Sequence, residues 1–198
     1  SGIAGLSACD EIRKRNKTCS IEIISDEDVF CYNRPMLTKG ILSEFDALNF
    51  FTKQLDWYKE NNITLTLSTK VESIDTAGKT LKCSDGQQRS YDKLILATGA
   101  ECNVPPIKGA DSSNVFVIRK LADANAIRQR LDATTDIVVI GGGVLGLEAA
   151  WEFDRAGKNV TILELADALM KNQLDAGASK LLQEGAEKSG INVLTGIQ

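Results

Sequence analysis

Three glycines and one acid in the second half of the chain have the spacing of a dinucleotide-binding turn. Gly141, Gly143 and Gly146 follow the apolar run Ile137–Ile140, and Glu164 comes 18 residues after the last of them. The first glycine permits a tight turn, the second lets the backbone approach a pyrophosphate, and the third lets a helix pack closely on its strand. Glu164 can accept hydrogen bonds from both hydroxyls of an adenosine ribose. The pattern therefore predicts the binding of a dinucleotide.

A strand, a turn, a helix and a second strand must hold these residues, and the sequence predicts each of them. Apolar residues have helical spacing from Val144 until Gly157, and Val160–Leu163 is the second strand. Val144 and Leu145 then lie in the first turn of the helix, whose unpaired N–H groups favour an anion. Glu164 would repel a 2′-phosphate, and no arginine follows it, which favours NAD over NADP. A glycine-rich turn in any α/β domain is the alternative interpretation.

The start of the chain resembles the end of a second turn of this kind. Gly2 and Gly5 have the spacing of the last two glycines, and a helix from Leu6 to about Arg15 and a strand at Ile21–Ile24 follow. Acids at positions 26 to 28, Glu27 among them, stand where a ribose would be held. The strand and first glycine expected before Gly2 are not in the sequence. Two such units predict two dinucleotides, against the alternative of an unrelated glycine pair before a helix.

Two basic residues lie in the polar segment CYNRPMLTKGI, at positions 31 to 41. The planar fork of Arg34 suits a pyrophosphate, because it matches the geometry of phosphate oxygens. Lys39 suits a point-charge role. In the alternative interpretation, Arg34 and Lys39 are ordinary charged side chains on a solvent-exposed loop.

The remaining elements predict an α/β fold with two Rossmann-like, three-layer (ββα) nucleotide-binding domains. We expect a first nucleotide-binding domain at residues 1–106, which contains an antiparallel meander but lacks its first strand, and a second at 107–198, which lacks its C-terminal part; both are thus incomplete. The segment Glu101–Gly109, which contains two prolines, is predicted to be the hinge between the two domains. The predicted helices are Asp46–Asn61, Leu121–Leu131 and Ala176–Lys188, and the predicted strands are Ile63–Leu67, Val71–Ile74, Thr80–Cys83, Gln88–Tyr91, Lys93–Ala97, Val115–Ile118 and Ile191–Leu194.

Composition excludes several classes of site. The 198 residues are 43% hydrophobic and 25% charged, and they contain no histidine, which excludes a Ser-His-Asp triad and histidine-ligated metals. A net charge of −4 argues against nucleic acid. No apolar run reaches the roughly 20 residues of a membrane span, and we expect no leader, because no charged-then-apolar stretch with a small-residue cleavage site opens the sequence. The cysteines have no metal or disulfide spacing, so we expect no metal and a reducing cytoplasm; they are Cys9, Cys19, Cys31, Cys83 and Cys102.

In combination, several motifs resemble the flavin-dependent pyridine nucleotide-disulfide oxidoreductase superfamily. They are SGIAGLSA, SDEDVFCYNRPMLTKGIL, YDKLILATGA, PPIKG, GGGVLGLEAAWEF and ALMKNQLDAGASKLLQEGAEKSGINV. The last is most similar to NADH:rubredoxin reductases and to the flavin portion of NADH-dependent nitrite reductases. The resemblance implies that the first domain, residues 1–106, holds FAD through Gly2, Gly5, Glu27, Arg34, Lys39, Val71, Thr98, Gly99 and Ala100. It implies that the second domain, residues 107–198, holds NADH through Gly141, Gly143, Gly146 and Glu164.

The resemblance also implies a mechanism, in which NADH delivers hydride to the flavin and the flavin passes electrons to an acceptor. Family members pair a lysine beside the flavin with a glutamate on the nucleotide-binding helix, and Lys39 and Glu148 occupy the matching positions. We expect this pair to bridge the two domains and orient the nicotinamide; support of the helix dipole is the alternative for Glu148. The CxxxxC pair of the disulfide reductases is missing, which removes a dithiol relay and leaves Cys31 as an ordinary loop residue.

The expected function is that of an NADH-dependent flavoprotein reductase. Its acceptor would be a small redox protein such as rubredoxin, or a siroheme module. The alternatives are an oxidase or peroxidase that uses dioxygen or peroxide, and a redox sensor that binds FAD and NADH without efficient turnover. A homodimer is left open. The superfamily pattern extends on both sides of these 198 residues, so we expect a piece of a longer protein.

Overall fold

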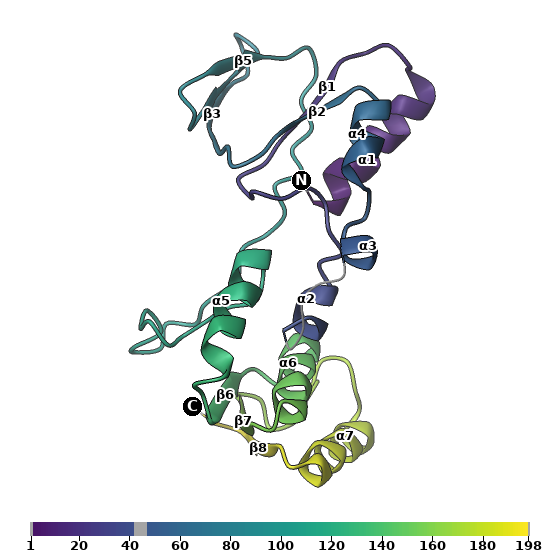
Figure 1. Cartoon of the computed structure of the whole chain (residues 1–198). Coiled ribbons are helices and arrows are strands. Elements are labelled where there is room, and N and C mark those ends of the chain that lie inside the picture. Colours follow the sequence, from purple (N-terminus) through teal and green to yellow (C-terminus); the bar gives the residue numbers. More distant parts are fainter. Residues whose placement is uncertain (1, 42–46, 198) are drawn as a thin grey trace. The chain divides into compact units, whose positions relative to one another are not determined.

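The computed structural model describes residues 2–41 and 47–197 of the chain (Figure 1). The chain divides into two compact units, each described by itself below. Unit 1 comprises residues 1–34 and 45–101, and unit 2 comprises residues 35–44 and 102–198. The predicted domain division at residues 106 and 107 stays a prediction, and the segment 35–44, which carries Lys39, groups with unit 2.

Unit 1 has a parallel pair of strands, an antiparallel meander and a helical layer. The parallel strands β1 (Ile21–Ile24) and β2 (Ile63–Thr66) pair in register from Ile21 beside Ile63. Apolar side chains of α1 (Ile3–Arg15) and α4 (Leu55–Glu60), such as Leu6 and Tyr58, pack with Ile23 and Ile63 in one core. The short α3 (Ala47–Phe50) precedes α4. The meander is formed by β3 (Val71–Asp75), β4 (Thr80–Cys83) and β5 (Gln88–Ser90), in that order.

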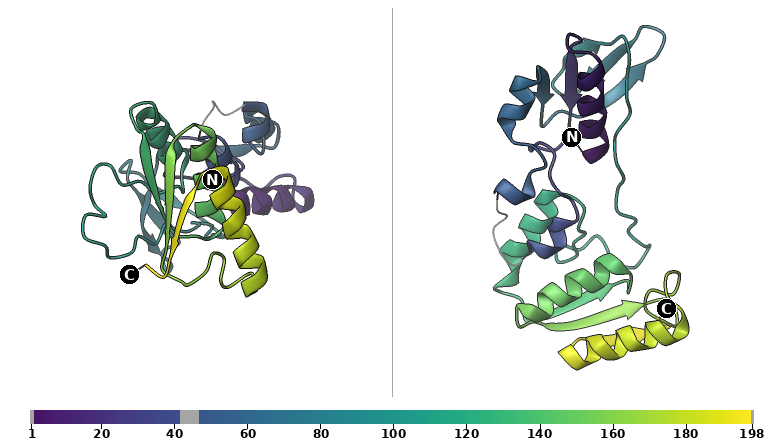
Figure 2. Two further views of the ribbon diagram at one scale, coloured as in Figure 1. Left: turned by 90° about the horizontal axis from the view of Figure 1, so that it is seen from below. Right: turned by 90° about the vertical axis from the view of Figure 1, so that its right-hand side faces the viewer.

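Unit 2 is built on a parallel sheet of order β6-β7-β8. Its strands are β6 (Asp136–Ile140), β7 (Asn159–Glu164) and β8 (Asn192–Thr195), and α6 (Val144–Arg155) and α7 (Ala176–Ser189) run beside them (Figure 2). α5 (Leu121–Leu131) and the short α2 (Met36–Lys39) complete the unit. The core joins Ile162 of β7 to Ala150 and Phe153 of α6. The predicted α/β class with parallel sheets is confirmed.

Two predicted strands do not form. Residues 93–97 and 115–118 have no strand structure. A strand needs a hydrogen-bonded neighbour to satisfy its backbone, and no named strand of the described residues pairs with either segment. The apolar side chains that predicted burial are instead exposed, as in Ile95 and Leu96. Apolar content alone did not distinguish a paired strand from an extended connection.

The predicted helix Asp46–Asn61 is divided into α3 and α4, and its first residue lies outside the described part of the chain. Backbone pairing with a distant segment explains the break. Phe51 forms a β-bridge with Tyr32, and the Thr52 N–H donates to the Cys31 carbonyl at 2.9 Å. These bonds use backbone groups that a continuous helix would need. Long-range pairing therefore overrides the helical spacing of the apolar residues.

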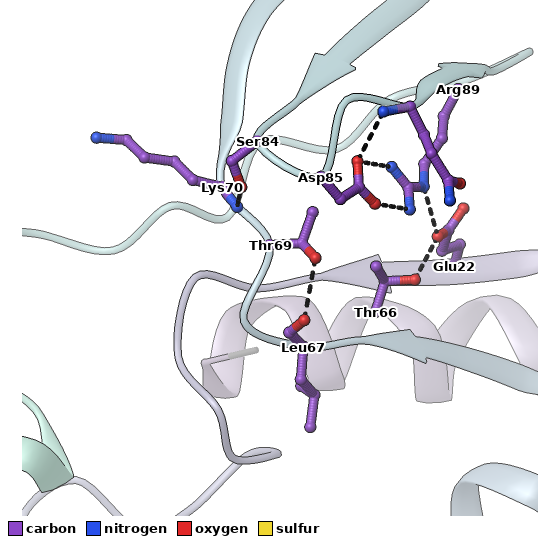
Figure 3. A network of polar contacts seen from close by, with 9 residues as sticks. Glu22, Thr66, Leu67, Thr69, Lys70, Ser84, Asp85 and Arg89 are labelled. Carbon is purple, nitrogen blue, oxygen red and sulfur yellow. Dashed lines mark hydrogen bonds and ion pairs between the residues drawn. The ribbon is translucent and has the colours of Figure 1, made fainter.

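One arginine ties the meander to the parallel strands of unit 1 (Figure 3). Arg89 of β5 donates to both carboxylate oxygens of Asp85, at 3.2 and 2.6 Å, and its Nε donates to Glu22 of β1 at 3.2 Å. Thr66 of β2 donates to the same oxygen of Glu22. The Arg89 side chain is only 16% exposed. The bidentate pair with Asp85, inside the meander, fixes the guanidinium, and the Nε bond to Glu22 then orients the meander on β1 and β2.

Replacing Arg89 with alanine should lower the Tm by a few degrees at neutral pH. The hydrogen bond from Arg89, followed by the backbone N–H of Gln87, holds the pKa of Asp85 below its ordinary value. A lowered folded pKa gives stability that is present above the ordinary pKa of about 4 and is lost as the pH falls through the folded value. The Tm difference between wild type and variant should therefore narrow below about pH 4. Lys82→Ala, which breaks an exposed pair with Glu72 in the same meander, should change the Tm little.

Candidate functional site: two glycine-led helix starts and their acids

The two long helices that follow the predicted glycine turns begin without a side-chain cap. Gly143 is the N-cap of the 12-residue α6 and Gly2 is the N-cap of the 13-residue α1, and neither helix has an acid in its first turn among the described residues. α7 differs, because its N-cap Asp175 accepts a hydrogen bond from the Ala178 N–H at 2.8 Å. Uncapped first-turn N–H groups and the positive end of the dipole favour an anion. The arrangement suits phosphate groups at α1 and α6.

The turn before α6 needs glycine at two positions for reasons seen in the backbone. Gly141 has a φ of 108°, which L side chains rarely adopt. A Cβ on Gly146 would stand 1.9 Å from the Gly141 carbonyl oxygen, so the helix can approach the turn only without one. At Gly143, by contrast, a Cβ would meet nothing within 4 Å among the described atoms. Space therefore remains at the predicted pyrophosphate position.

Glu164, the predicted ribose acid, lies against this turn at the end of β7. Its Oε2 accepts from the Gly142 N–H at 2.6 Å and its Oε1 accepts from the Ala166 N–H at 2.7 Å. An ionised carboxylate has about four acceptor positions, so it can still accept from ribose hydroxyls. The sequence reasoning passed over Gly142, although the run of three glycines was visible. Val144 and Leu145 follow the turn with exposed side chains.

The predicted acid of unit 1 forms a compact cluster with two other side chains. Glu27 accepts from the Tyr32 hydroxyl at 2.6 Å and from an Arg34 guanidinium nitrogen at 2.9 Å, and that guanidinium stands 4.9 Å from the centre of the Tyr32 ring. Burial alone would lower the pKa of Arg34, but the bond to Glu27 and the nearby Tyr32 raise it overall. The structure thus brings two predicted FAD residues, Glu27 and Arg34, together. Sequence reasoning missed Tyr32, since nothing in its spacing marks it.

The other predicted FAD residues of unit 1 lie on segments that contact its acid or its first helix, whereas Lys39 groups with unit 2 and its FAD role stays a prediction. The Ser68 N–H donates to the Glu27 carbonyl at 3.0 Å, which brings the connection before Val71 and β3 beside the acid. A Cβ on Gly5 would be 3.6 Å from the Ala97 Cβ, so the residue before Thr98 lies on the first turns of α1. Gly99 has a φ of 74°, which accounts for glycine there. The cofactor roles of Gly2, Gly5, Val71 and Thr98-Gly99-Ala100 stay predictions.

Glu148 of α6 receives a hydrogen bond from a residue that sequence reasoning did not consider. The hydroxyl of Thr38, which is buried in α2, donates to Glu148 Oε2 at 2.9 Å. Lys39 follows with an exposed side chain, and within the described residues no ion pair joins it to Glu148. Arg128 of α5 donates to the Gly40 carbonyl at 3.2 Å, and Ile41 is buried in the core of unit 2. The segment that carries Lys39 is therefore anchored beside α6, while the Lys39–Glu148 pair stays a prediction.

The cysteines form no disulfide and join no cluster of metal-ligating side chains in the part of the chain that the structure covers. All five are free thiols, and no group of three or more metal-ligating side chains occurs among the described residues. Cys31 is buried and its sulfur lies 3.6 Å from the Thr52 hydroxyl. Burial of this kind makes a thiol a poor nucleophile.

No helix among the described residues has the length and apolar content required to cross a membrane.

Comparison with known proteins identifies a family that matches the whole chain. A protein-family model described as pyridine nucleotide-disulphide oxidoreductase matches residues 1–198. The rubredoxin-NAD(+) reductase of Pseudomonas putida is 34% identical over 192 residues, which is 96% of this chain and 50% of that protein. The nitrite reductase [NAD(P)H] of Bacillus subtilis (strain 168) is 38% identical over 195 residues, which is 98% of this chain and 24% of that protein.

A solved structure has the same fold. The crystal structure of NADH:rubredoxin oxidoreductase from Clostridium acetobutylicum matches with a TM-score of 0.89 and 28% identity, over 100% of this chain and 51% of that chain. The chain thus spans about half the length, or less, of the relatives it matches.

Proposed function

The chain belongs to the pyridine nucleotide-disulphide oxidoreductase family, as its motifs predicted, and we propose that it is the nucleotide-binding part of an NADH-dependent, FAD-containing reductase. Members of this family bind FAD and NAD(P)H. One observation carries the proposal: two uncapped, glycine-led helix starts occur in one chain, each followed by a strand and an acid. Two such starts suit two dinucleotides rather than one.

The residues of each unit fit the cofactor that the family would place there. In unit 1, the first turn of α1 would hold the FAD phosphates and Glu27 the ribose, with Arg34 held against that acid. In unit 2, the turn Gly141–Gly146 would hold the NADH pyrophosphate and Glu164 the adenosine ribose. When bound, the two cofactors supply the hydride and electron chemistry. The protein supplies binding, orientation and charge.

Glu148 and Lys39 are the residues we propose to act closest to the reaction. The Thr38 hydroxyl donates to one carboxylate oxygen of Glu148, which fixes that side chain on α6 and leaves the second oxygen to orient the nicotinamide or Lys39. The Lys39 ammonium would stabilise negative charge that develops on the flavin. Support of the α6 dipole does not explain Glu148 well, because it stands beyond the first turn and has a side-chain donor of its own.

Alanine at Lys39 should slow flavin reduction by NADH roughly 100-fold, and alanine at Glu148 should slow it at least about tenfold, with folding intact. Stopped-flow absorbance in the absence of oxygen measures the rate, and thermal unfolding checks the fold. Lys180→Ala and Glu184→Ala remove the same charges from α7 of unit 2, where the two side chains are 78% and 44% exposed, and serve as controls. Unchanged reduction rates in both test variants would refute the proposed pair and favour a redox sensor.

The acceptor is proposed as a small redox protein of the rubredoxin kind or a siroheme module. Similarity to a rubredoxin reductase and to a nitrite reductase supports these two. An oxidase or peroxidase is the alternative, and stoichiometric consumption of dioxygen or peroxide without a protein acceptor would favour it. A cytoplasmic location is part of the same proposal.

A further inference from the structure

The central glycine of the predicted NADH turn is held from two sides by the protein itself. The Gly142 N–H donates to Glu164 Oε2 at 2.6 Å, and the Gly142 carbonyl accepts from the Met170 N–H at 3.1 Å. Both groups of one residue are thereby fixed by residues that follow β7. From this geometry we propose that Glu164, Leu169 and Met170 are positioning residues that preset the turn for a pyrophosphate, an inference that rests on the proposed function.

Packing fixes the same residue from a third direction. A Cβ on Gly142 would stand 2.4 Å from Leu169 Cδ2 and 3.2 Å from Glu164 Oε2, so these side chains occupy the space that a larger residue would need. Leu169 is fully buried, and its carbonyl accepts a hydrogen bond from the buried Ser179 hydroxyl of α7. The turn therefore rests against a side chain that is itself anchored to a helix. This arrangement restricts the orientation of the peptide that precedes Gly143.

The backbone at Met170 adopts an uncommon conformation to make its contact. Its φ of 52° lies in the left-handed region, which costs free energy for any residue that has a Cβ. Three hydrogen bonds compensate for this cost. The Met170 N–H donates to Gly142, and the Met170 carbonyl accepts from the N–H groups of Gln173 and Leu174 at 2.8 and 3.0 Å. The strained residue thus forms a tight turn whose N–H is directed at the glycine turn.

Glu164 consequently has a structural function in addition to its predicted bond to ribose. Two backbone N–H groups, those of Gly142 and Ala166, donate to its two different oxygens. Glutamine has one oxygen and one NH2 group, so one of the two N–H groups would face a donor. Neutralising Glu164 should therefore loosen the turn, and it should weaken the binding of NADH without improving the binding of NADPH. If Glu164 acted only by repelling a 2′-phosphate, neutralising it would instead improve NADPH binding.

Amide exchange and nucleotide titration of the 198-residue chain test this inference. The amides of Gly142, Ala166 and Met170 should be protected in the wild type without nucleotide, and the Gly142 and Ala166 amides should exchange faster in Glu164→Gln. The Kd for NADH should rise about tenfold or more, since a charge-assisted hydrogen bond is lost. Leu169→Ala, which keeps the carboxylate, should also accelerate exchange at Gly142. Glu184→Gln on exposed α7 is the matched control for charge.

Unchanged amide protection in both test variants would overturn the inference, and so would tighter NADPH binding by Glu164→Gln. A wild type that binds no NADH would instead refute the proposed function, and the exchange rates would still decide whether these residues hold the turn.

Discussion

Replacing Gly143 with aspartate should weaken NADH binding strongly while leaving the protein at least as stable as the wild type. A Cβ at this position meets nothing within 4 Å among the described atoms, and the backbone, at φ −84° and ψ −177°, accepts any residue. Aspartate is a favourable N-cap and its charge suits the start of α6, which together should stabilise the protein by about 0.5 kcal/mol. The same carboxylate would occupy the phosphate position and repel it. We expect the Kd for NADH to rise roughly 100-fold or more.

Titration of NADH fluorescence and thermal unfolding measure the two effects separately. Gly143→Asn is the matched control, because asparagine caps the helix without adding charge and should weaken binding less than aspartate does. Opposite changes in stability and affinity would be hard to explain by misfolding. An aspartate variant that binds NADH like the wild type would refute the placement of the pyrophosphate at α6.

Valine at Gly146 should have the opposite effect on stability and unfold unit 2. A Cβ there would lie 1.9 Å from the Gly141 carbonyl oxygen, far closer than the 3.0 Å below which real Cβ contacts essentially never occur. The obstacle is backbone rather than a flexible side chain, so α6 and β6 would have to separate. The loss of stability should be about 3 kcal/mol or more. Loss of near-UV circular dichroism and of cooperative thermal unfolding would record it.

Gly185 of α7 provides the contrasting substitution, because a Cβ there meets nothing within 4 Å among the described atoms. Alanine at this helical position should stabilise the protein by about 0.5–1 kcal/mol. If Gly146→Val unfolded at the wild-type temperature, the close contact between α6 and its turn would be wrong.

The parts of the fold with local causes were predictable from the sequence. The helices at 121–131 and 144–155 and the strands of the meander follow from apolar spacing and turn residues. Gly141 and Gly146 were identifiable because the motif assigns each of them a separate steric reason, and the structure shows that reason at both. The partners of these residues were less accessible. Gly142 and Met170 meet only because the chain folds back after β7.

Long-range contacts explain what the sequence did not reveal. Thr38 and Glu148 are separated by 110 positions, so no local pattern links them. The break between α3 and α4 arises from pairing with residues 31–33, which the apolar spacing of that segment cannot indicate. For Tyr32, the hydroxyl bond to Glu27 likewise depends on tertiary structure. Motifs thus identified the acids and glycines, and only the fold identified the side chains that hold them.

The most direct test of the account is the reduction of bound FAD by NADH. The protein would be mixed with FAD, freed of unbound flavin and titrated with NADH without oxygen, while the oxidised-flavin absorbance is followed near roughly 450 nm. We expect the band to bleach with NADH and to change little with NADPH, because Glu164 disfavours a 2′-phosphate. Retained FAD that NADH does not reduce, although NADH binds, would contradict the proposed reductase.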